Sequence, residues 1–283
     1  MRGWLVYNAK GIKRNEWFAS ALCDSASKFG LDLELVLVKD LRFGVSEGKK
    51  SVKLRGNTVS LPDFVICRTI LPLLSEFFEA LGVPVFNSAE VSRICNDKRR
   101  THLVFSDMGI DMADTIFFEK QTFDPSSLDY PAVLKSNDGH GGKQVFWANN
   151  EKDAEMRLQN GLGTAFLAQR PVMPGKDVRV YLLDGEVIFA ALRSCETDFR
   201  SNFSLGGNVA CYTPSAEMLS VVSKVQNRLS PFYVGIDFTF NEEGQPLLNE
   251  IEDVVGARMI YELTDLSMHD LYLDRLSKKL KTL

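Results

Sequence analysis

The 283-residue sequence predicts an α/β (α+β) fold, with a parallel sheet in the first part of the chain and antiparallel, strand-rich structure in the rest. Over residues 1–88, apolar strand-like segments alternate with amphipathic helical segments, a pattern that builds a parallel sheet with helices against it. Two hairpin signals follow, Asp184-Gly185 between apolar segments and an acidic segment over residues 234–252. A chain of this length allows two or three domains.

The first strands and the first helix come from the N-terminal segment. Residues 4–7 form a short apolar strand, and residues 15–29 carry apolar side chains on one helical face before Gly30. No G-x-G-x-x-G motif follows the first strand, so dinucleotide binding there is not supported. Further strands are predicted at residues 33–38, 64–67 and 83–86.

The later elements follow a different order. Residues 88–108 are predicted to form two helical pieces, with Ser88 and Asp97 as N-caps. From Tyr130 onward the pattern becomes rich in strands. Amphipathic helices are expected at residues 217–229 and 265–281.

Composition excludes several classes of function. The net charge of −4 argues against a surface that binds nucleic acid or lipid. The five scattered cysteines lack a C-x-x-C pair and fit reduced thiols. The N-terminus lacks a signal-peptide core, and no apolar run approaches the ~18 residues that span a bilayer. We therefore expect a cytoplasmic protein with no nucleic-acid and no membrane partner.

The second predicted hairpin carries carboxylates at strand positions. Side chains alternate between the two faces of a strand. Glu250 and Glu252 are therefore expected to share one face with Leu248. Asn249 and Ile251 are then expected on the opposite face.

Pairing within this hairpin brings a third carboxylate to the same face. With a two-residue turn at Glu243-Gly244, Asp237 pairs directly with Glu250. Like charges at such positions, with Cβ atoms roughly 4.5–5.5 Å apart, are destabilising, whereas Mg²⁺ is commonly held by a few carboxylates plus phosphates. Asp237, Glu250 and Glu252 therefore predict a magnesium site. A solvated acidic face without an ion is the alternative.

A glycine cluster follows the apolar segment that ends at Lys135. Glycines lack a Cβ atom, so their backbone N–H groups can approach phosphate oxygens. The segment is not a P-loop, because Gln144 follows Gly142-Lys143 and the next residues predict a strand rather than a helix. A glycine-rich turn with surface lysines is the alternative, and Lys98-Arg99-Arg100 has the alternative of a solvated helical face. The glycines concerned are Gly139, Gly141 and Gly142.

Seven short motifs follow one another along the chain. They are Asn96-Asp-Lys98 with Thr101, Tyr130–Lys135 with the glycine loop, Ala168–Val172, Gly175–Val180, Ala191–Arg193, Asp198–Phe203 with Gly206-Gly207, and the pair Val234–Asp237 and Asn249–Glu252. In this order they resemble the ATP-grasp fold, and most closely the RimK-type glutamate ligases. The resemblance implies an N-terminal α/β domain over residues 1–88, a central ATP-grasp subdomain with a glycine-rich lid loop over 89–170, and a C-terminal ATP-grasp subdomain with the magnesium site over 171–283.

The resemblance also implies a role for each matching residue. Lys98 and Lys135 would contact the phosphates of ATP beneath the loop of Gly139, Gly141 and Gly142. Adenine would meet the hinge of Gln169, Arg170, Pro171 and Val172, the ribose would lie near Asp177, and Arg200, Ser201 and Asn202 would contact the nucleotide. Arg193 and Arg200 are the implied catalytic residues, with Arg193 beside the transferred phosphate. Asp237, Glu250 and Glu252 match the Mg²⁺ positions, for which two ions are expected, with Mn²⁺ as a substitute.

The implied activity is ATP-dependent carboxylate–amine ligation through an acyl phosphate. Glutamate or another amino acid would supply the amine, with Arg200 or Arg258 near its α-carboxylate, and the acceptor would be a carboxylate of a small molecule, peptide or protein. The family pattern has asparagine where Glu252 stands, and the segment that follows Glu252 also departs from the pattern, which leaves the acceptor open. The sequence separately leaves open whether the chain forms a homo-oligomer. The alternatives are a small-molecule kinase and a non-catalytic, ATP-binding regulatory protein of the same fold.

Overall fold

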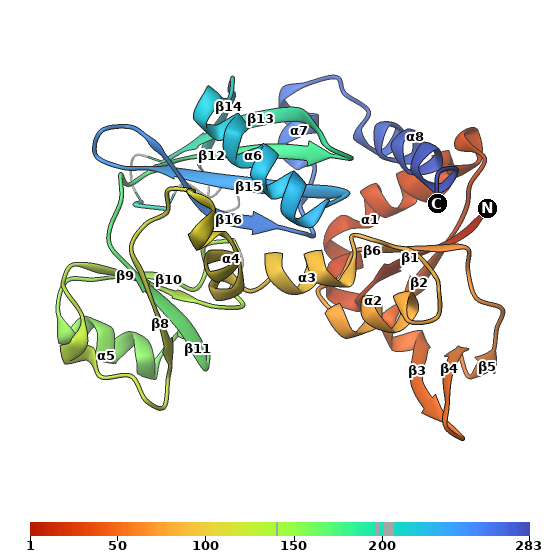
Figure 1. The fold of residues 1–283 in the computed structure, drawn as a ribbon, viewed down its shortest axis with the longest axis horizontal. Helices are drawn as coiled ribbons and strands as arrows, with labels where there is room; N and C mark the ends of the chain where they lie inside the picture. Colours follow the sequence, from red (N-terminus) through yellow and green to blue (C-terminus); the bar gives the residue numbers. More distant parts are fainter. Residues whose placement is uncertain (140, 196–197, 201–206) are drawn as a thin grey trace.

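Within residues 1–139, 141–195, 198–200 and 207–283, which the computed structural model describes, the chain folds around four β-sheets (Figure 1). Parallel and antiparallel sheets both occur, so the predicted α/β (α+β) class is confirmed. The N-terminal, central and C-terminal sheets follow one another along the sequence, and Figure 1 shows them as separate groups of arrows. The fourth, smaller sheet is inserted between β2 and β6 of the N-terminal sheet. The exact division at residues 88 and 170 stays a prediction.

The first sheet is parallel, with strand order β2-β1-β6-β7. Along β1 the side chains alternate, with Leu5 and Tyr7 in one core cluster and Trp4 and Val6 in another. Both faces of a parallel sheet are covered, which explains why its strands are apolar throughout. The elements are β1 (Arg2–Tyr7), α1 (Ala9–Ser25), β2 (Asp32–Leu37), β6 (Phe64–Cys67), α2 (Pro72–Glu79) and β7 (Val85–Phe86).

A small antiparallel sheet of order β3-β4-β5 was not predicted from the sequence. Its turns at Glu47-Gly48 and Arg55-Gly56 have positive φ at both residues, as tight hairpin turns require. Leu41, Phe43 and Val45 occupy alternate positions of β3, so a strand signal was present in the sequence although it was not used. β4 carries three lysines and half of its residues are exposed, which weakens the signal on the partner strand. The strands are β3 (Leu41–Ser46), β4 (Lys49–Leu54) and β5 (Asn57–Thr58).

The central sheet is antiparallel, with order β10-β9-β11-β8, and α5 covers one face (Figure 1). Two helices precede it, and their predicted N-caps are confirmed. The side chain of Ser88 accepts from the N–H of Val91, and that of Asp97 accepts from the N–H of Arg100. The elements are α3 (Ala89–Cys95), α4 (Lys98–Phe105), β8 (Thr115–Glu119), β9 (Ala132–Ser136), β10 (Val145–Ala148), α5 (Glu151–Gln159) and β11 (Ala165–Gln169).

The C-terminal sheet is antiparallel, with order β14-β13-β12-β15-β16. The predicted hairpin at Asp184-Gly185 is confirmed, because these two residues join β12 to β13 with φ of 45° and 86°. The elements are β12 (Lys176–Leu183), β13 (Glu186–Ser194), β14 (Asn208–Cys211), α6 (Ala216–Leu229), β15 (Tyr233–Phe240), β16 (Pro246–Glu252), α7 (Arg258–Leu263) and α8 (Met268–Leu280).

The acidic hairpin of β15 and β16 has the predicted pairing but not the predicted turn. Asp237 pairs with Glu250, as expected. The loop is longer than two residues at Glu243-Gly244, because the N–H of Asn241 donates to the carbonyl of Gln245 at 3.0 Å. A β-bulge next to Asp237 restores the register. The longer loop and the bulge shift the pairing in opposite directions, so Asp237 still lies opposite Glu250.

The bulge also corrects the predicted faces of β16. Asn249 is the extra residue of the bulge. Leu248 therefore turns into the same core cluster as Ile251, while the side chain of Asn249 accepts a hydrogen bond from Lys135 on the other side of the sheet. The expectation that Leu248 shares the face of Glu250 and that Asn249 points away is wrong, because one inserted residue reverses the alternation of a strand.

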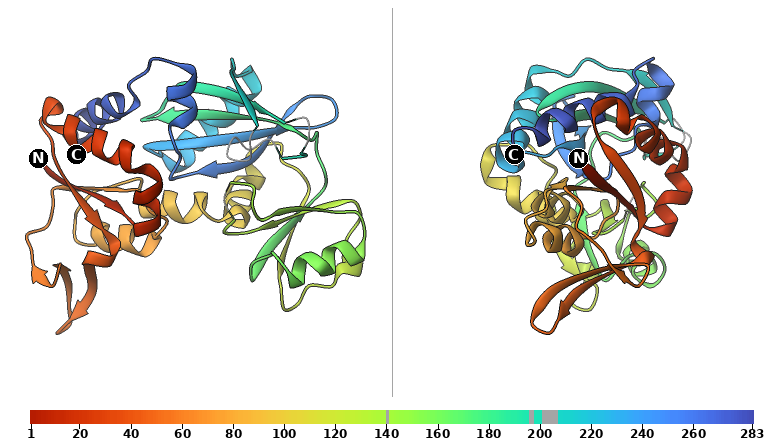
Figure 2. Two further views of the ribbon diagram at one scale, coloured as in Figure 1. Left: turned by 180° about the vertical axis from the view of Figure 1, so that it is seen from behind. Right: turned by 90° about the vertical axis from the view of Figure 1, so that its right-hand side faces the viewer.

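The last helix returns to the first sheet. Leu273 and Leu276 of α8 belong to the same core cluster as Leu5 of β1 and Leu22 of α1. Figures 1 and 2 show α8 beside α1, with both chain ends at this end of the molecule. The core of the N-terminal sheet is thus completed by residues from the opposite end of the sequence.

Two further features concern membrane spans and thiols. Among the described residues, no helix combines the length and apolar character needed to cross a membrane. The thiols of Cys23, Cys67, Cys95 and Cys211 are free. The cellular compartment stays a prediction.

Candidate active site

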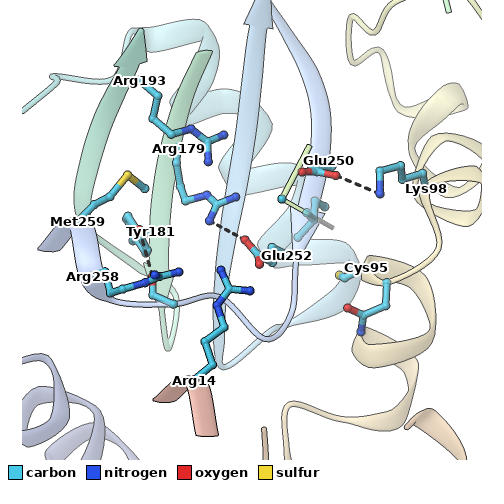
Figure 3. A pocket seen from close by; sticks show the side chains of 14 residues that line it. Arg14, Cys95, Lys98, Arg179, Tyr181, Arg193, Glu250, Glu252, Arg258 and Met259 are labelled. Atoms are coloured by element: carbon cyan, nitrogen blue, oxygen red, sulfur yellow. Dashed lines mark hydrogen bonds and ion pairs between the residues drawn. The ribbon is translucent and has the colours of Figure 1, made fainter. Parts of the chain in front are cut away.

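Two adjoining pockets lie on the charged face of the C-terminal sheet. Pocket A lies between this sheet and the central sheet, and pocket B lies between the C-terminal sheet, α1 and α7 (Figure 3). Pocket A has a volume of about 810 Å³ and pocket B of about 780 Å³, in both cases including the open mouth. Both pockets are lined by Lys98, Gly141, Arg193 and Glu250.

Alternation along β12 explains why this face of the sheet is charged. Val178 and Val180 belong to a core cluster, so the intervening Arg179 faces the other way, as does Asp177. The register then sets Asp177 opposite Arg193 of β13, and Arg179 opposite Asp237 of β15. Four charged groups from three strands therefore meet on one face.

Asp237 is fully buried, and both of its carboxylate oxygens accept hydrogen bonds from arginines. Arg179 donates from Nε and Nη2 at 2.6 and 2.7 Å, and Arg193 donates from Nη2 at 2.8 Å. Arg193 also donates to Asp177. Burial alone would raise the pKa of Asp237, but the two guanidinium groups hold that pKa well below its usual range. The carboxylate is therefore ionised at neutral pH.

Arg179 also links Asp237 to the second acidic position of β16. Its Nη1 lies 2.5 Å from Oε2 of Glu252, and Figure 3 shows this ion pair at the wall of pocket B. Gly235 pairs with both Tyr181 and Glu252. A Cβ at Gly235 would lie 3.1 Å from Cδ of Arg179. The missing side chain thus leaves room for Arg179 to cross the sheet.

Two lysines approach Glu250 from the central region. Nζ of Lys98 lies 3.4 Å from Oε2 of Glu250, and Nζ of Lys135 donates to Oδ1 of Asn249 at 2.8 Å. Burial alone would raise the pKa of Glu250, but Lys98, Arg179 and Lys135 together hold that pKa below its usual value. Withdrawal from solvent lowers the pKa of Lys135 to about 8, with Lys98 adding to the effect and Glu250 opposing it.

The described glycines of the loop line pocket A and are held by the predicted cations. Gly141 and Gly142 have φ of 64° and 74°, which glycine adopts without strain. Nζ of Lys98 donates to the carbonyl of Gly139 at 2.6 Å, and Nη1 of Arg200 donates to that of Gly142 at 2.9 Å. The loop is therefore bonded across pocket A to helix α4 and to the segment around Arg200.

The predicted hinge forms the far wall of pocket A. The side chain of Gln169 donates to Oγ1 of Thr115 at 2.9 Å and lies 3.4 Å from Nε2 of His102. Burial, with a contribution from Lys135, lowers the pKa of His102 to about 4, so its ring is neutral at pH 7. Trp147 and other apolar side chains line the same pocket, which suits a flat aromatic ligand.

The structure brings together most of the predicted site. Pocket A is lined by Lys98, Lys135, Gly139, Gly141, Gly142, Gln169, Arg170, Val172, Asp177, Arg193, Arg200 and Glu250, and pocket B by Glu252. Pro171 is not among the lining residues. Ser201 and Asn202 lie outside the described residues.

Sequence reasoning assigned no role to Arg179, Asn249 or His102. Arg179 had a usable signal, because a charged residue between two valines of a predicted strand faces away from the core. Asn249 had none, because its direction depends on the bulge. His102 had none either, because its contact with Gln169 joins a helix to a distant strand.

The oxygen ligands available for Mg²⁺ are only partly free. Glu250 and Glu252 line pocket B and offer carboxylate oxygens, the ligands that Mg²⁺ prefers. Asp237 does not offer its oxygens in this arrangement, because Arg179 and Arg193 occupy them. In the described part of the chain, no three His, Cys, Asp or Glu side chains come together as a metal site. The metal-binding role of Asp237 stays a prediction, and it requires an arginine to move.

Comparison with known sequences connects this geometry to a family. A model of the RimK-like ATP-grasp domain matches residues 95–271. An uncharacterised protein of Mycoplasma pneumoniae is 27% identical over 263 residues, covering 92% of this chain and 86% of that protein. N-acetylaspartylglutamate synthase A of Homo sapiens is 29% identical over 258 residues (83% and 65%), and a probable alpha-L-glutamate ligase of Parasynechococcus marenigrum is 26% identical over 276 residues (92% and 59%). The chain thus spans about three fifths of the length of these two named enzymes.

Solved structures have the same fold over the whole chain. The ATP-grasp ligase PsnB, complexed with minimal precursor, Mg and ADP, matches with a TM-score of 0.71 and 14% identity, covering 99% of this chain and 98% of that one. A RimK domain protein of Sphaerobacter thermophilus matches with a TM-score of 0.70 and 17% identity, covering 99% and 100%. At such identities the likeness concerns the fold alone. Because the family model spans more than half of the sequence, the chain belongs to the RimK-like ATP-grasp family and is an ATP-grasp ligase.

Proposed function

We propose that the chain uses ATP bound in pocket A to join a substrate carboxylate, bound in pocket B, to an amine. The observation that carries this proposal is that Lys98, Arg193 and Glu250 line both pockets. A terminal phosphate in pocket A and a carboxylate in pocket B would therefore meet among the same side chains. Holding two reactants in contact removes much of the barrier to their reaction.

The chemistry has two steps. A carboxylate oxygen of the substrate attacks the γ-phosphorus of ATP in line, the bond to the β-phosphate oxygen breaks, and ADP and an acyl phosphate form. The amine nitrogen then attacks the acyl carbon, the bond to the phosphate oxygen breaks, and an amide forms with release of phosphate and a proton. The first step turns an unreactive carboxylate into an electrophile, which is why ATP is consumed.

The side chains of the site would act mainly through charge. Lys98, Lys135 and Arg193 would offset the negative charge of the transferred phosphoryl group. Asp177 and Asp237 would keep Arg193 in place, because each accepts one of its hydrogen bonds. The loop of Gly139 to Gly142 would exclude water, which protects the acyl phosphate from hydrolysis.

Magnesium would be held by Glu250 and Glu252 together with phosphate oxygens, and when bound it would supply further neutralisation of the phosphates. Two ions, with Mn²⁺ as a substitute, are our expectation. The PsnB complex with Mg and ADP supports a magnesium-dependent reaction.

Glutamate is our proposed amine donor, and the acceptor would be a small-molecule, peptide or protein carboxylate. The relatives called alpha-L-glutamate ligase, N-acetylaspartylglutamate synthase and beta-citrylglutamate synthase support glutamate as a substrate. PsnB complexed with its precursor supports a peptide acceptor. Of the two arginines considered for the donor's α-carboxylate, Arg258 lines pocket B, whereas Arg200 lines pocket A and is bonded to Asp198.

The test is ADP release screened over amino acids and candidate carboxylates, followed by mass spectrometry of the product. An added amino acid minus water identifies a ligase, and an added phosphate identifies a kinase. Lys135→Ala and Glu250→Ala should abolish amine-dependent ADP release, whereas Lys120→Ala, at an exposed lysine outside both pockets, should not. Full turnover in either site variant contradicts the proposed site, and no stimulation by any pair favours a non-catalytic protein.

A further inference from the structure

Pocket B has a second positive region, separate from the cations proposed to contact the transferred phosphate. Arg14 of α1 and Arg258 of α7 line the pocket, and Figure 3 shows both side chains on the side away from Lys98. Both residues are exposed, and neither guanidinium group has a partner among the described residues. They therefore differ from Arg179 and Arg193, which are buried in ion pairs.

The acidic residues of pocket B do not neutralise this pair. Glu250 is paired with Lys98, and Glu252 is paired with Arg179. Glu250 and Glu252 are also the proposed magnesium ligands, so their negative charge would be balanced by the metal near the reacting atoms rather than by Arg14 and Arg258. Arg14 and Arg258 thus leave a local charge of about +2 at the mouth, and such a charge attracts an anion.

An aromatic contact holds together the two helices that carry these arginines. The rings of Trp17 in α1 and Tyr261 in α7 meet edge to face, with centroids 4.9 Å apart. Trp17 makes a similar contact with His269 of α8 at 5.8 Å. Arg14 and Arg258 each lie three residues before one of the two paired rings. Their backbones are therefore fixed relative to each other although they come from opposite ends of the chain.

Resting on the proposed function, we propose that Arg14 and Arg258 bind a second carboxylate of the substrates, one that is not activated by ATP. Guanidinium groups match carboxylates with pairs of parallel hydrogen bonds. The carboxylate has two possible sources, a dicarboxylate acceptor or the α-carboxylate of the amino-acid donor. In both cases Arg14 and Arg258 favour a substrate that carries a carboxylate in addition to the group that reacts.

The experiment measures binding rather than turnover, by calorimetric titration of the ADP-bound protein. For the acceptor, glutarate is compared with butyrate, and for the donor, L-glutamate is compared with its α-amide. The wild type should bind the member with the extra carboxylate about tenfold more tightly or better, as a hydrogen-bonded charge contributes. Arg14→Gln or Arg258→Gln should remove this preference, and the arm in which it is lost identifies the source.

The controls separate this inference from folding and from the ligase proposal. Arg42→Gln removes an exposed arginine outside both pockets and should keep the preference, while Arg258→Lys should retain part of it because the charge remains. ADP affinity and the melting temperature should be unchanged in all variants. Equal binding within each pair, no binding of either member, or a preference that survives both glutamine variants would overturn the inference. Loss of turnover with an intact preference would count against the ligase proposal alone.

Discussion

Replacing Asp237 by alanine should lower the free energy of unfolding by about 3–5 kcal/mol, which is the usual effect of removing one partner from a buried ion pair. The carboxylate is fully buried and accepts three hydrogen bonds, two from Arg179 and one from Arg193. Without it, the acidic partners left within the described residues are the partly exposed Glu252 for Arg179 and Asp177 for Arg193. Two buried cations thus lose their shared counter-charge.

The assay is urea unfolding followed by circular dichroism, with Glu186→Gln as the control. Glu186 pairs with Arg275 on the surface and is 60% exposed, so its replacement should cost at most about 1 kcal/mol. A loss of less than 1 kcal/mol for Asp237→Ala, similar to the control, would refute our description of the buried charge cluster.

The same carboxylate predicts a pH dependence. The folded-state pKa of Asp237 lies below the unfolded value of about 3.9. Its contribution is therefore fully present above pH 3.9 and is lost as the pH falls through the folded-state pKa. The stability difference between the wild type and Asp237→Asn should be constant at neutral pH and should shrink below about pH 4.

Three further predictions concern other parts of the molecule. Because the pKa of Lys135 is about 8, kcat/KM for ATP should fall as the pH rises above 8 in steady-state assays. Lys135→Arg should remove this fall, since arginine stays charged. An unchanged fall above pH 8 in this variant would exclude Lys135 as its source. Gly235→Ala should lower the free energy of unfolding in urea by roughly 1–3 kcal/mol, because the new Cβ would lie 2.8 Å from a methyl carbon of Val255. The control is Gly44→Ala in β3, where the new Cβ would meet open space and this loss should not occur. Asn87→Ala should lower the free energy of unfolding, measured by thermal unfolding, by at least about 2 kcal/mol, because the N–H groups of Phe232 and Tyr233 lose their acceptor. A change below about 0.5 kcal/mol, the usual limit for surface substitutions, would contradict this role of Asn87.

Local patterns predict the elements well where one physical cause dominates. Asp184-Gly185 lies between apolar strands and must turn with positive φ, and Ser88 and Asp97 must satisfy the free N–H groups of the helices that they begin. The sheet of β3 to β5 was missed although Leu41, Phe43 and Val45 alternate along β3, because the exposed lysines of β4 obscure the pattern on the partner strand.

The site was predictable to the extent that its residues follow strand alternation. Asp237 opposite Glu250 required only a hairpin register, and this pairing holds. The direction of Asn249 did not follow, because a bulge depends on how two strands fit together and not on the sequence of one of them. The pairing of Asp237 with Arg179 likewise required the order of β12 and β15 in the sheet, which hydrophobic periodicity does not contain.

The return of α8 to the first sheet has a consequence for how the protein is made. Leu273 and Leu276 complete a core that begins at Leu5, so this core cannot close on the ribosome until residues 268–280 have emerged. The strands of the N-terminal sheet therefore wait with one face partly uncovered while residues 87–280 are synthesised, a period in which exposed apolar surface promotes association.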